Sequence, residues 1–299
     1  MLDVVIIGSG PAGITAAIYA KRANLNVAVV EKEYLGTGQI AESSRVDNYP
    51  GIPGIDGYSL GEKFREHAES LGVEFTEAQV LSLGQKDGIW IIGCDEDITL
   101  ESKAVIYATG CKNRPLGVPG EEKYYGRGLS FCAVCDGAFY KGKRVAVIGG
   151  GDTALDDAMY LSDICEKVYL VHRREFFRGS ASILEKLKQK ENVEIIVNAR
   201  VEEITGDKKI DGIILDNKTK LNISGLFAAV GMIPQTELLK EFGVLDESNY
   251  VKASEDTKTT VNGLFAAGDV RTKQLRQVVT AAADGANAIY SVMEYLRNI

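Results

Sequence analysis

The chain has 299 residues, of which 45% are hydrophobic and 25% charged, a composition typical of globular proteins. This length allows two domains, each with its own core. The formal net charge of −8 argues against a general nucleic-acid-binding protein, which needs clustered Lys and Arg. No apolar run is long enough to span a membrane, and no signal peptide precedes the first strand-like segment, so a cytoplasmic protein is expected.

The first predicted element is a buried strand over residues 4–7, which leads into the sequence Gly-Ser-Gly-Pro-Ala-Gly at residues 8–13. A helix over 11–22 and a second strand over 27–30 follow. This is the context in which G-x-G-x-x-G binds a pyrophosphate, because the glycines allow close approach and the helix N-terminus offers free N–H groups. Glu31 ends the second strand, where a carboxylate can bind an adenosine ribose, although a solvated acidic residue remains the alternative. The segment is suited to the ADP half of a flavin dinucleotide.

Residues 145–171 repeat this order of strand, glycine turn, helix and strand, with Gly149 at the position of Gly8. The fingerprint at 149–154 reads Gly-Gly-Gly-Asp-Thr-Ala. Alanine at the last position is an accepted variant that still allows close packing of helix and strand. The chain therefore contains two predicted dinucleotide-binding sites.

The second site differs from the first at the ribose end. His172 takes the position of Glu31, and Arg173, Arg174 and Arg178 follow. Basic side chains remove the repulsion of a carboxylate and donate hydrogen bonds to a 2′-phosphate. We therefore expect NADPH rather than NADH, with a solvated basic loop as the alternative.

A Cys-x-x-Cys sequence, Cys132-Ala133-Val134-Cys135, lies between the two fingerprints. Two sulfurs at this spacing readily close a ring, and a lowered thiol pKa favours disulfide exchange. A lone pair can be half of a zinc site, but the chain has no second pair and only two histidines, so no metal is expected. Asp136 can exchange protons with the sulfurs or can serve as a cap or turn residue. The other cysteines are expected to be small buried hydrophobic residues: Cys94, Cys111 and Cys165.

Three apolar runs end at a glycine: residues 105–110, 226–231 and 264–269. We assign the first and third to the first nucleotide domain and the second to the other, which inserts the second domain into the first. The predicted fold class is α/β, with two doubly wound Rossmann-like domains.

The expected domains are an FAD-binding domain over 1–113 and 246–299, and an NADPH-binding domain with the Cys-x-x-Cys over 114–245. Alternating apolar segments within 73–107 and 193–230 predict a small antiparallel β-meander in each domain.

In order and spacing, these motifs resemble the low-molecular-weight (bacterial-type) thioredoxin reductases, class II of the pyridine nucleotide-disulfide oxidoreductases. The resemblance extends over essentially the whole chain. It is carried by residues 8–13, Gly38-Gln39, Asn48-Tyr49-Pro50-Gly51, Ala108-Thr109-Gly110, Cys132 to Gly137, 149–154, His172-Arg173-Arg174 with Arg178, Gly268-Asp269-Val270 and Arg276-Gln277-Val278. The stretch Gly36-Thr37-Gly38-Gln39 departs from the usual run of adjacent glycines.

The resemblance implies a homodimeric NADPH-dependent flavoprotein, in which a hydride passes from NADPH to FAD and the flavin reduces the Cys132–Cys135 disulfide. The dithiol then reduces thioredoxin. It further implies that Cys135 faces the flavin, Cys132 attacks the partner's disulfide and Asp136 handles protons. Rotation of the inserted domain would let the nicotinamide and the dithiol take turns at the flavin.

The same resemblance implies the cofactor-binding residues. Asp269 would lie near the ribityl chain of FAD, and residues 276–278 beside its isoalloxazine ring. The full sets are Gly8, Gly10, Pro11, Ala12, Gly13, Glu31, Lys32, Gly38, Gln39, Asn48, Gly110, Gly268, Asp269, Arg276, Gln277 and Val278 for FAD, and Gly149, Gly151, Asp152, Thr153, Ala154, His172, Arg173, Arg174 and Arg178 for NADPH.

Other functions remain open at this point. One is a flavin-dependent reductase of a glutaredoxin-like or peroxidase partner, or a dithiol oxidase. The second fingerprint and its arginines argue against relatives that take electrons from ferredoxin. A non-catalytic nucleotide-sensing or zinc-bound protein is a further alternative.

Overall fold

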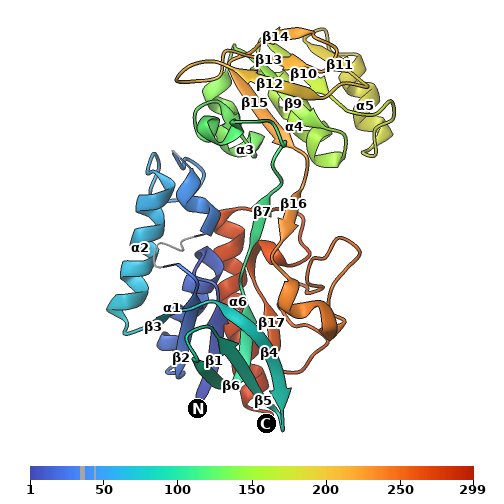
Figure 1. Ribbon diagram of the computed structural model, residues 1–299. Coiled ribbons are helices and arrows are strands. Elements are labelled where there is room, and N and C mark those ends of the chain that lie inside the picture. The colour runs from blue at the N-terminus through green and yellow to red at the C-terminus, as the bar shows by residue number, and fades with distance from the viewer. Residues whose placement is uncertain (34–37, 44) are drawn as a thin grey trace. The chain divides into compact units, whose positions relative to one another are not determined.

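The structure, a computed structural model, describes residues 1–33, 38–43 and 45–299. The chain divides into two compact units (Figure 1): unit 1 comprises Met1–Lys112 and Ile233–Ile299, and unit 2 comprises Asn113–Met232. The boundary expected at residue 245 is wrong, because the chain returns to unit 1 at Ile233. Leu239 and Val244 beyond it are buried in the core of unit 1.

The central sheet of unit 1 contains five parallel strands. They are ordered β3 (Glu74–Glu77), β2 (Val27–Glu31), β1 (Leu2–Ile7), β6 (Thr99–Tyr107) and β17 (Leu264–Ala266). The strands of the first fingerprint thus lie in the middle of the sheet. Hydrophobic residues fill β1 and β2 almost continuously, as burial on both faces of a parallel sheet requires.

The meander of unit 1 joins the same sheet. β4 (Val80–Lys86) pairs antiparallel with β5 (Ile89–Cys94), and β5 pairs antiparallel with the first part of β6. The later part of β6 pairs with β17 instead. One long strand therefore serves both the meander and the parallel sheet.

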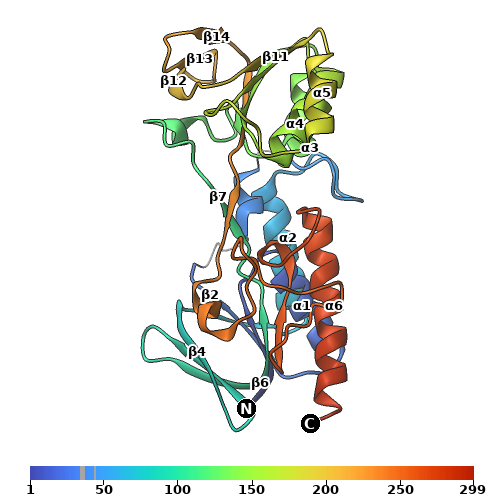
Figure 2. The same cartoon turned by 90° about the vertical axis from the view of Figure 1, so that its right-hand side faces the viewer.

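Helices α1 (Pro11–Arg22) and α6 (Val278–Leu296) pack side by side, as Figure 2 shows. Gly285 permits this contact, since a side chain there would collide with the main-chain oxygen of Ala12. A helix α2 (Gly57–Ser70) and the short helices η1 (Gly38–Glu42), η4 (Glu237–Phe242) and η5 (Gly268–Val270) complete the unit.

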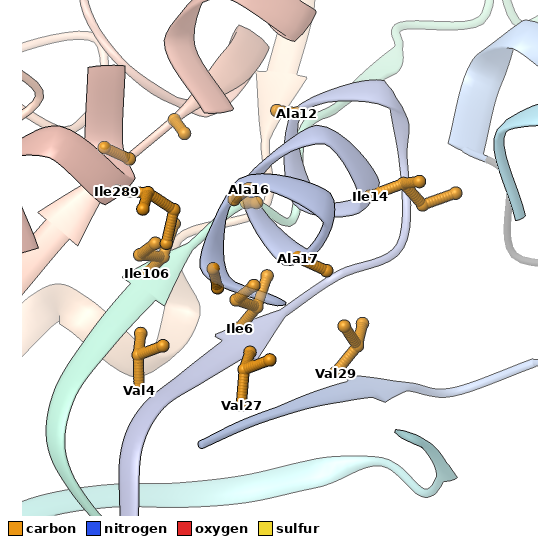
Figure 3. Close-up of a cluster of buried hydrophobic side chains, with 14 of the residues drawn as sticks. Val4, Ile6, Ala12, Ile14, Ala16, Ala17, Val27, Val29, Ile106 and Ile289 are labelled. Atoms are coloured by element: carbon orange, nitrogen blue, oxygen red, sulfur yellow. The ribbon is translucent and has the colours of Figure 1, made fainter. Parts of the chain in front are cut away.

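One hydrophobic core cluster of unit 1 lies between the sheet and α1 (Figure 3). Strand residues such as Ile6 and Val29 face Ala16 and Ala17 of the helix, and Ile289 of α6 joins them. Small alanines on α1 let the helix approach the sheet closely, which fixes the start of α1 against the end of β1.

Unit 2 repeats the order of the first four strands of unit 1, but its fifth strand, β8 (Leu129–Ser130), comes first along the chain of the unit, whereas β17 comes last in unit 1. Its five parallel strands are β11 (Val193–Ile196), β10 (Lys167–Val171), β9 (Arg144–Gly149), β15 (Gly225–Ala229) and β8. The two units are therefore copies of one doubly wound architecture, as the paired fingerprints predict.

The meander of unit 2 is a separate antiparallel sheet, unlike that of unit 1. It consists of β12 (Val201–Thr205), β13 (Gly212–Leu215) and β14 (Lys220–Asn222). The helical elements of the unit are η2 (Glu121–Tyr124), α3 (Ala133–Asp136), η3 (Gly137–Tyr140), α4 (Asp152–Ile164) and α5 (Ala181–Lys188).

The chain passes between the units along β7 (Cys111–Asn113) and β16 (Met232–Pro234), which pair with each other. Across the described ranges of the chain, none of the helices combines the length and apolar character needed to cross a membrane.

Candidate functional site

The first glycine loop joins β1 to α1 at the carboxyl edge of the sheet. Gly8 has a φ of +105°, and a Cβ there would lie 2.5 Å from the main-chain oxygen of Ala108. A Cβ on Gly13 would collide with the oxygen of Gly8. Both positions therefore require glycine, and the loop exposes main-chain N–H groups at the start of α1.

Glu31 at the end of β2 faces this loop. Its Oε2 accepts hydrogen bonds from the main-chain N–H of Ser9 at 2.7 Å and from the Ser9 hydroxyl at 2.9 Å. Its Oε1 accepts the N–H of Lys32 at 2.8 Å. The carboxylate is thereby fixed beside the glycine loop, where the sequence predicts a ribose ligand.

Asp269 lies on η5, which follows β17 at the same edge of the sheet. Its Oδ1 is buried and has no hydrogen-bond partner within residues 1–33, 38–43 and 45–299. Burial raises the pKa of this carboxyl to about 6, although Lys273 and Arg276 act to lower it. A buried acceptor without a partner is costly and points to a ligand donor.

The structure also brings together segments from opposite ends of unit 1. The side-chain amide of Asn48 donates to Oε1 of Gln277 at 2.8 Å. Gln277 caps α6, and Val278 packs on the apolar cluster around Ile40. The backbone of Gly38 approaches the first loop, since a Cβ added at Gly38 would lie 3.5 Å from the Cα of Gly10.

Arg276, next to this cap, donates to the main-chain oxygen of Asp269 at 3.2 Å and lies over the ring of Tyr250 at 4.1 Å. The residues expected to bind FAD thus converge on the carboxyl edge of the unit 1 sheet. Gly36 and Thr37, where the sequence departs from the resembling family, lie outside the described residues.

The second glycine loop joins β9 to α4 in unit 2. Gly149 has a φ of +159°, and a Cβ there would lie 2.7 Å from the Ala154 Cβ. Around Gly151 there is open space, with nothing within 4 Å of an added Cβ. Asp152 and Thr153 are exposed at the start of α4. The loop therefore leaves room for a ligand beside Gly151.

His172 follows β10, as Glu31 ends β2, but its role in the local structure differs. Its ring is buried directly against Gly150, whose Cβ would collide with the ring atoms. Its Nε2 lies 3.2 Å from the oxygen of Phe176. Burial lowers the pKa of His172, and the neighbouring arginines lower it further. The ring therefore packs as a neutral group under the glycine loop.

The three arginines after His172 lie at or near the surface. Arg173, Arg174 and Arg178 form no salt bridge with a carboxylate in the described part of the chain. The main-chain N–H of Arg178 donates to the oxygen of Gly150 at 2.7 Å, which holds this loop beside the glycine turn. Cationic side chains next to an open glycine loop suit an anionic nucleotide.

Cys132 and Cys135 form a disulfide with 5.3 Å between their Cα atoms. Cys132 is the N-cap of α3, and the N–H of Cys135 donates to its sulfur at 3.1 Å. The dithiol follows β8 directly, and the second glycine loop follows β9 in the same parallel sheet. Both therefore lie at the carboxyl edge of the unit 2 sheet, where ligands of doubly wound folds bind.

Asp136 is held by Ser130, a residue that sequence reasoning missed. The Ser130 hydroxyl donates to Oδ2 of Asp136 at 2.6 Å and accepts the N–H of Cys132 at 3.1 Å. Burial raises the pKa of Asp136, and the Ser130 hydrogen bond opposes this increase. A raised pKa suits a carboxyl that exchanges protons near neutral pH.

The remaining cysteines are buried free thiols, as the sequence predicts: Cys94, Cys111 and Cys165. Burial raises the pKa of Cys111 to about 12 and that of Cys165 to about 11. Cys132 and Cys135 are therefore the exchange-competent sulfurs of the chain. The described residues contain no group of three or more His, Cys, Asp or Glu able to hold a metal ion.

Two doubly wound units and the Cys132–Cys135 disulfide define a class of two-domain disulfide oxidoreductase. Residues 2–285 match the family described as pyridine nucleotide-disulphide oxidoreductase, and the chain belongs to that family. Within it the chain is an enzyme of the thioredoxin reductase type, as the following similarities establish.

The thioredoxin reductase of Bacillus subtilis is 38% identical over 305 residues, which cover 99% of this chain and 95% of that protein. A 34.2 kDa protein in the rubredoxin operon of Clostridium pasteurianum is 39% identical over 303 residues, which cover 99% and 97%. The crystal structure of thioredoxin reductase from Streptococcus pyogenes has a TM-score of 0.94 and 40% identity, with 100% of this chain and 99% of that chain covered.

Proposed function

We propose that the protein is an NADPH-dependent flavoprotein that reduces the disulfide of thioredoxin. FAD would bind in unit 1 and NADPH in unit 2. The observation that carries the proposal is the Cys132–Cys135 disulfide at the carboxyl edge of a nucleotide-binding sheet. Relatives named thioredoxin reductase, similar over nearly their whole length, support the choice of partner.

The residues of unit 1 suit FAD. Gly8 and Gly13 leave the main chain accessible for a pyrophosphate, and Glu31 offers its carboxylate to ribose hydroxyls. The unpartnered Oδ1 of Asp269 is an acceptor for a hydroxyl of the ribityl chain. Gln277 and Arg276 would lie beside the ring system.

The residues of unit 2 suit NADPH. The open space at Gly151 accommodates a pyrophosphate at the N-terminus of α4. Arg173, Arg174 and Arg178 would donate to the 2′-phosphate, which NADH lacks. We assign His172 a supporting role, because its buried ring packs on Gly150 and is not aimed at solvent.

When bound, the two cofactors supply hydride transfer and the electron pair that reduces the disulfide. The chain's own residues then carry out the exchange. The Cys132 thiolate attacks one sulfur of oxidised thioredoxin, and the departing sulfur takes up a proton. The Cys135 thiolate next attacks the Cys132 sulfur, which restores the disulfide and releases the second thiol of thioredoxin. Asp136 stores and returns the protons.

The proposal includes a homodimer in the cytoplasm. Three free buried thiols beside one exchangeable disulfide agree with a reducing compartment. Sedimentation of the purified protein tests the dimer.

Anaerobic titration with NADPH tests the cofactors and the dithiol together. We expect a yellow protein whose flavin absorbance is bleached, with two new thiols per chain when the disulfide opens. Oxidation of NADPH that depends on added thioredoxin and a disulfide dye identifies the partner. Equal rates without thioredoxin would favour a reductase of another dithiol protein or a dithiol oxidase.

Two cysteine variants test the order of the sulfurs. Cys135→Ser should leave bleaching of the flavin by NADPH intact and abolish disulfide turnover. Cys132→Ser should also abolish turnover, and Cys165→Ala serves as the control because its thiol is buried and outside the disulfide. Loss of flavin bleaching together with turnover in Cys135→Ser would contradict the assigned order.

A further inference from the structure

A buried charge cluster in unit 1 lies outside the residues assigned so far. Asp284 on α6 accepts hydrogen bonds from Arg271 Nε at 2.8 Å and Arg271 Nη2 at 2.6 Å. Lys273 Nζ donates to the same carboxylate at 2.8 Å. The side chains of Asp284, Arg271 and Lys273 are only 3%, 3% and 6% exposed. We call these three residues the Asp284 cluster.

The Asp284 cluster holds the turn that carries Asp269. Oδ2 of Asp284 accepts the main-chain N–H of Gly268 at 2.9 Å. Gly268 has a φ of +82°, and a Cβ there would lie 2.9 Å from the Cβ of Ala12 on α1. The residue before Asp269 is therefore fixed between α6 and the start of α1.

The same turn is held from its other side. The thiol of Cys111 donates to the main-chain oxygen of Asp269 at 2.9 Å, and Nε of Arg276 donates to it at 3.2 Å. Arg276 Nη2 also donates to the oxygen of Arg271 at 3.3 Å. The main chain of Asp269 is thus held on both sides, while its buried Oδ1 has no partner in the described part of the chain.

The charges of the cluster do not cancel. Two cations surround one carboxylate, and the nearby carboxylate of Glu255 is 89% exposed at 3.5 Å from Arg271. The structure leaves a buried positive charge beside Asp269. Such a charge is costly unless a second anion balances it, and the Asp269 carboxylate is positioned to do so.

We propose that the Asp284 cluster is a positioning device that holds Asp269 in place, and ionised, to accept a hydroxyl of the flavin's ribityl chain. This inference rests on the proposed function, since it takes unit 1 as the FAD site. Asp284 fixes the main chain of the turn through Gly268. Lys273 provides the charge that favours the carboxylate form of Asp269.

The titration of Asp269 follows from the groups around it. Burial raises its pKa to about 6, Lys273 and Arg276 lower it, and Asp284 raises it. Cys111 and Tyr250 are the other titratable groups of this region, and both have raised pKa values, so they are neutral near pH 7. FAD affinity should therefore fall as the pH drops through the pKa of Asp269, where the carboxylate becomes protonated.

The first test measures the dissociation constant of FAD by flavin fluorescence with deflavinated full-length protein. Asp284→Asn should weaken FAD binding about tenfold or more, as expected for loss of charged hydrogen bonds. Glu294→Gln is the control, since Glu294 lies on the same helix and pairs with Lys258 at 2.6 Å near the surface. Equal affinity of Asp284→Asn and the wild type, both folded by circular dichroism, would overturn the proposal.

The second test uses Lys273→Met, which keeps the Asp284 carboxylate and its hydrogen bond from the N–H of Gly268. The pH at which FAD affinity is half lost should move upward relative to the wild type, and Lys273→Arg should restore it. A purely structural role of Lys273 would weaken binding without moving that pH, and this result would contradict the proposal. A wild-type protein that binds no FAD at any pH would instead refute the proposed function.

Discussion

The Oγ of Ser130 lies 2.6 Å from Oδ2 of Asp136 and donates a hydrogen bond to it. The serine is on β8 and the aspartate at the end of α3, so the pair links the sheet to the helix that carries the dithiol. Through its bond with the N–H of Cys132, the same hydroxyl connects the proposed proton carrier to the proposed attacking cysteine.

Ser130→Ala should therefore change the pH dependence of disulfide reduction. Burial raises the pKa of Asp136, and Ser130 acts against this increase. Removing the hydroxyl should raise the pKa further and move the limb of the pH–rate profile that belongs to Asp136 to higher pH. Stopped-flow turnover across a range of pH from acidic to alkaline checks the shift.

Ser162→Ala is the matched control, because its hydroxyl bonds to the Met159 oxygen within α4 and not to Asp136. Ser130→Thr keeps a hydroxyl and should retain the wild-type profile. An unchanged profile in Ser130→Ala would show that the hydrogen bond does not tune the carboxyl.

The double variant Arg173→Ala with Arg174→Ala should shift the preference from NADPH toward NADH. The expected loss of NADPH binding is about 1–3 kcal/mol, the range for lost charged hydrogen bonds. Nucleotide titration of the flavin spectrum measures it. Arg200→Ala, an exposed arginine elsewhere in unit 2, is the control. Unchanged selectivity would assign the two arginines to the solvated surface.

Neighbouring glycines of the second loop should respond differently to alanine. Gly150→Ala should lower the melting temperature without nucleotide, because its Cβ would collide with the His172 ring. Gly151→Ala should leave that temperature nearly unchanged, since nothing lies within 4 Å, but should weaken NADPH binding by filling the ligand's space. Calorimetry with and without NADPH separates the effects. Equal melting temperatures of the two variants would disprove the packing role of His172.

Asp157 on α4 gives a prediction about stability. Burial raises its pKa from 3.8 to about 7, and the neighbouring Asp156 adds to the increase. The folded state therefore binds the proton more tightly than the unfolded state, and stability is lost as the pH rises from 3.8 toward 7. Asp157→Asn should stabilise the protein above pH 7 by roughly 2–4 kcal/mol and by little near pH 4. Urea unfolding at both pH values checks this, with Asp207→Asn, at an exposed position elsewhere in unit 2, as the control.

The sequence predicted much of the fold because its strongest signals are local. The helix expected over 11–22 forms over those residues, since the glycine turn and Pro11 fix its start. The boundary at 245 was wrong although Gly231 and Pro234 flank the return of the chain at Ile233, because glycine and proline also mark turns within a domain. Only the burial of Leu239 against distant strands reveals it.

Site residues whose roles depend on side-chain contacts made only in the folded chain could not be found in this way. Ser130 is an ordinary strand residue until the fold places it against Asp136. The bond between Asn48 and Gln277 spans 229 positions. Asp284 could have been suspected, since a charged residue in the middle of a mostly apolar helix needs a partner, but only the structure identifies Arg271 and Lys273.

The two glycine fingerprints also differ at a pair of residues that contact each other, a difference that neither motif reveals by itself. Ser9 and Gly150 are the second residues of their loops, and each faces the residue at the end of the next strand. Glu31 fits against Ser9 through two hydrogen bonds, whereas the wider ring of His172 requires glycine at position 150. Replacing Ser9 or Gly150 by its counterpart in the other loop, without changing Glu31 or His172, would leave a void or a clash.

Burial of the three free thiols has a consequence for oxidative damage. Peroxide attacks thiolates, and the raised pKa values of Cys94, Cys111 and Cys165 keep these residues protonated and enclosed. Peroxide is thereby directed to Cys132 and Cys135, where the first oxidation product condenses to the disulfide that each catalytic cycle forms anyway. Mild peroxide stress should thus consume reducing equivalents and leave the catalyst intact.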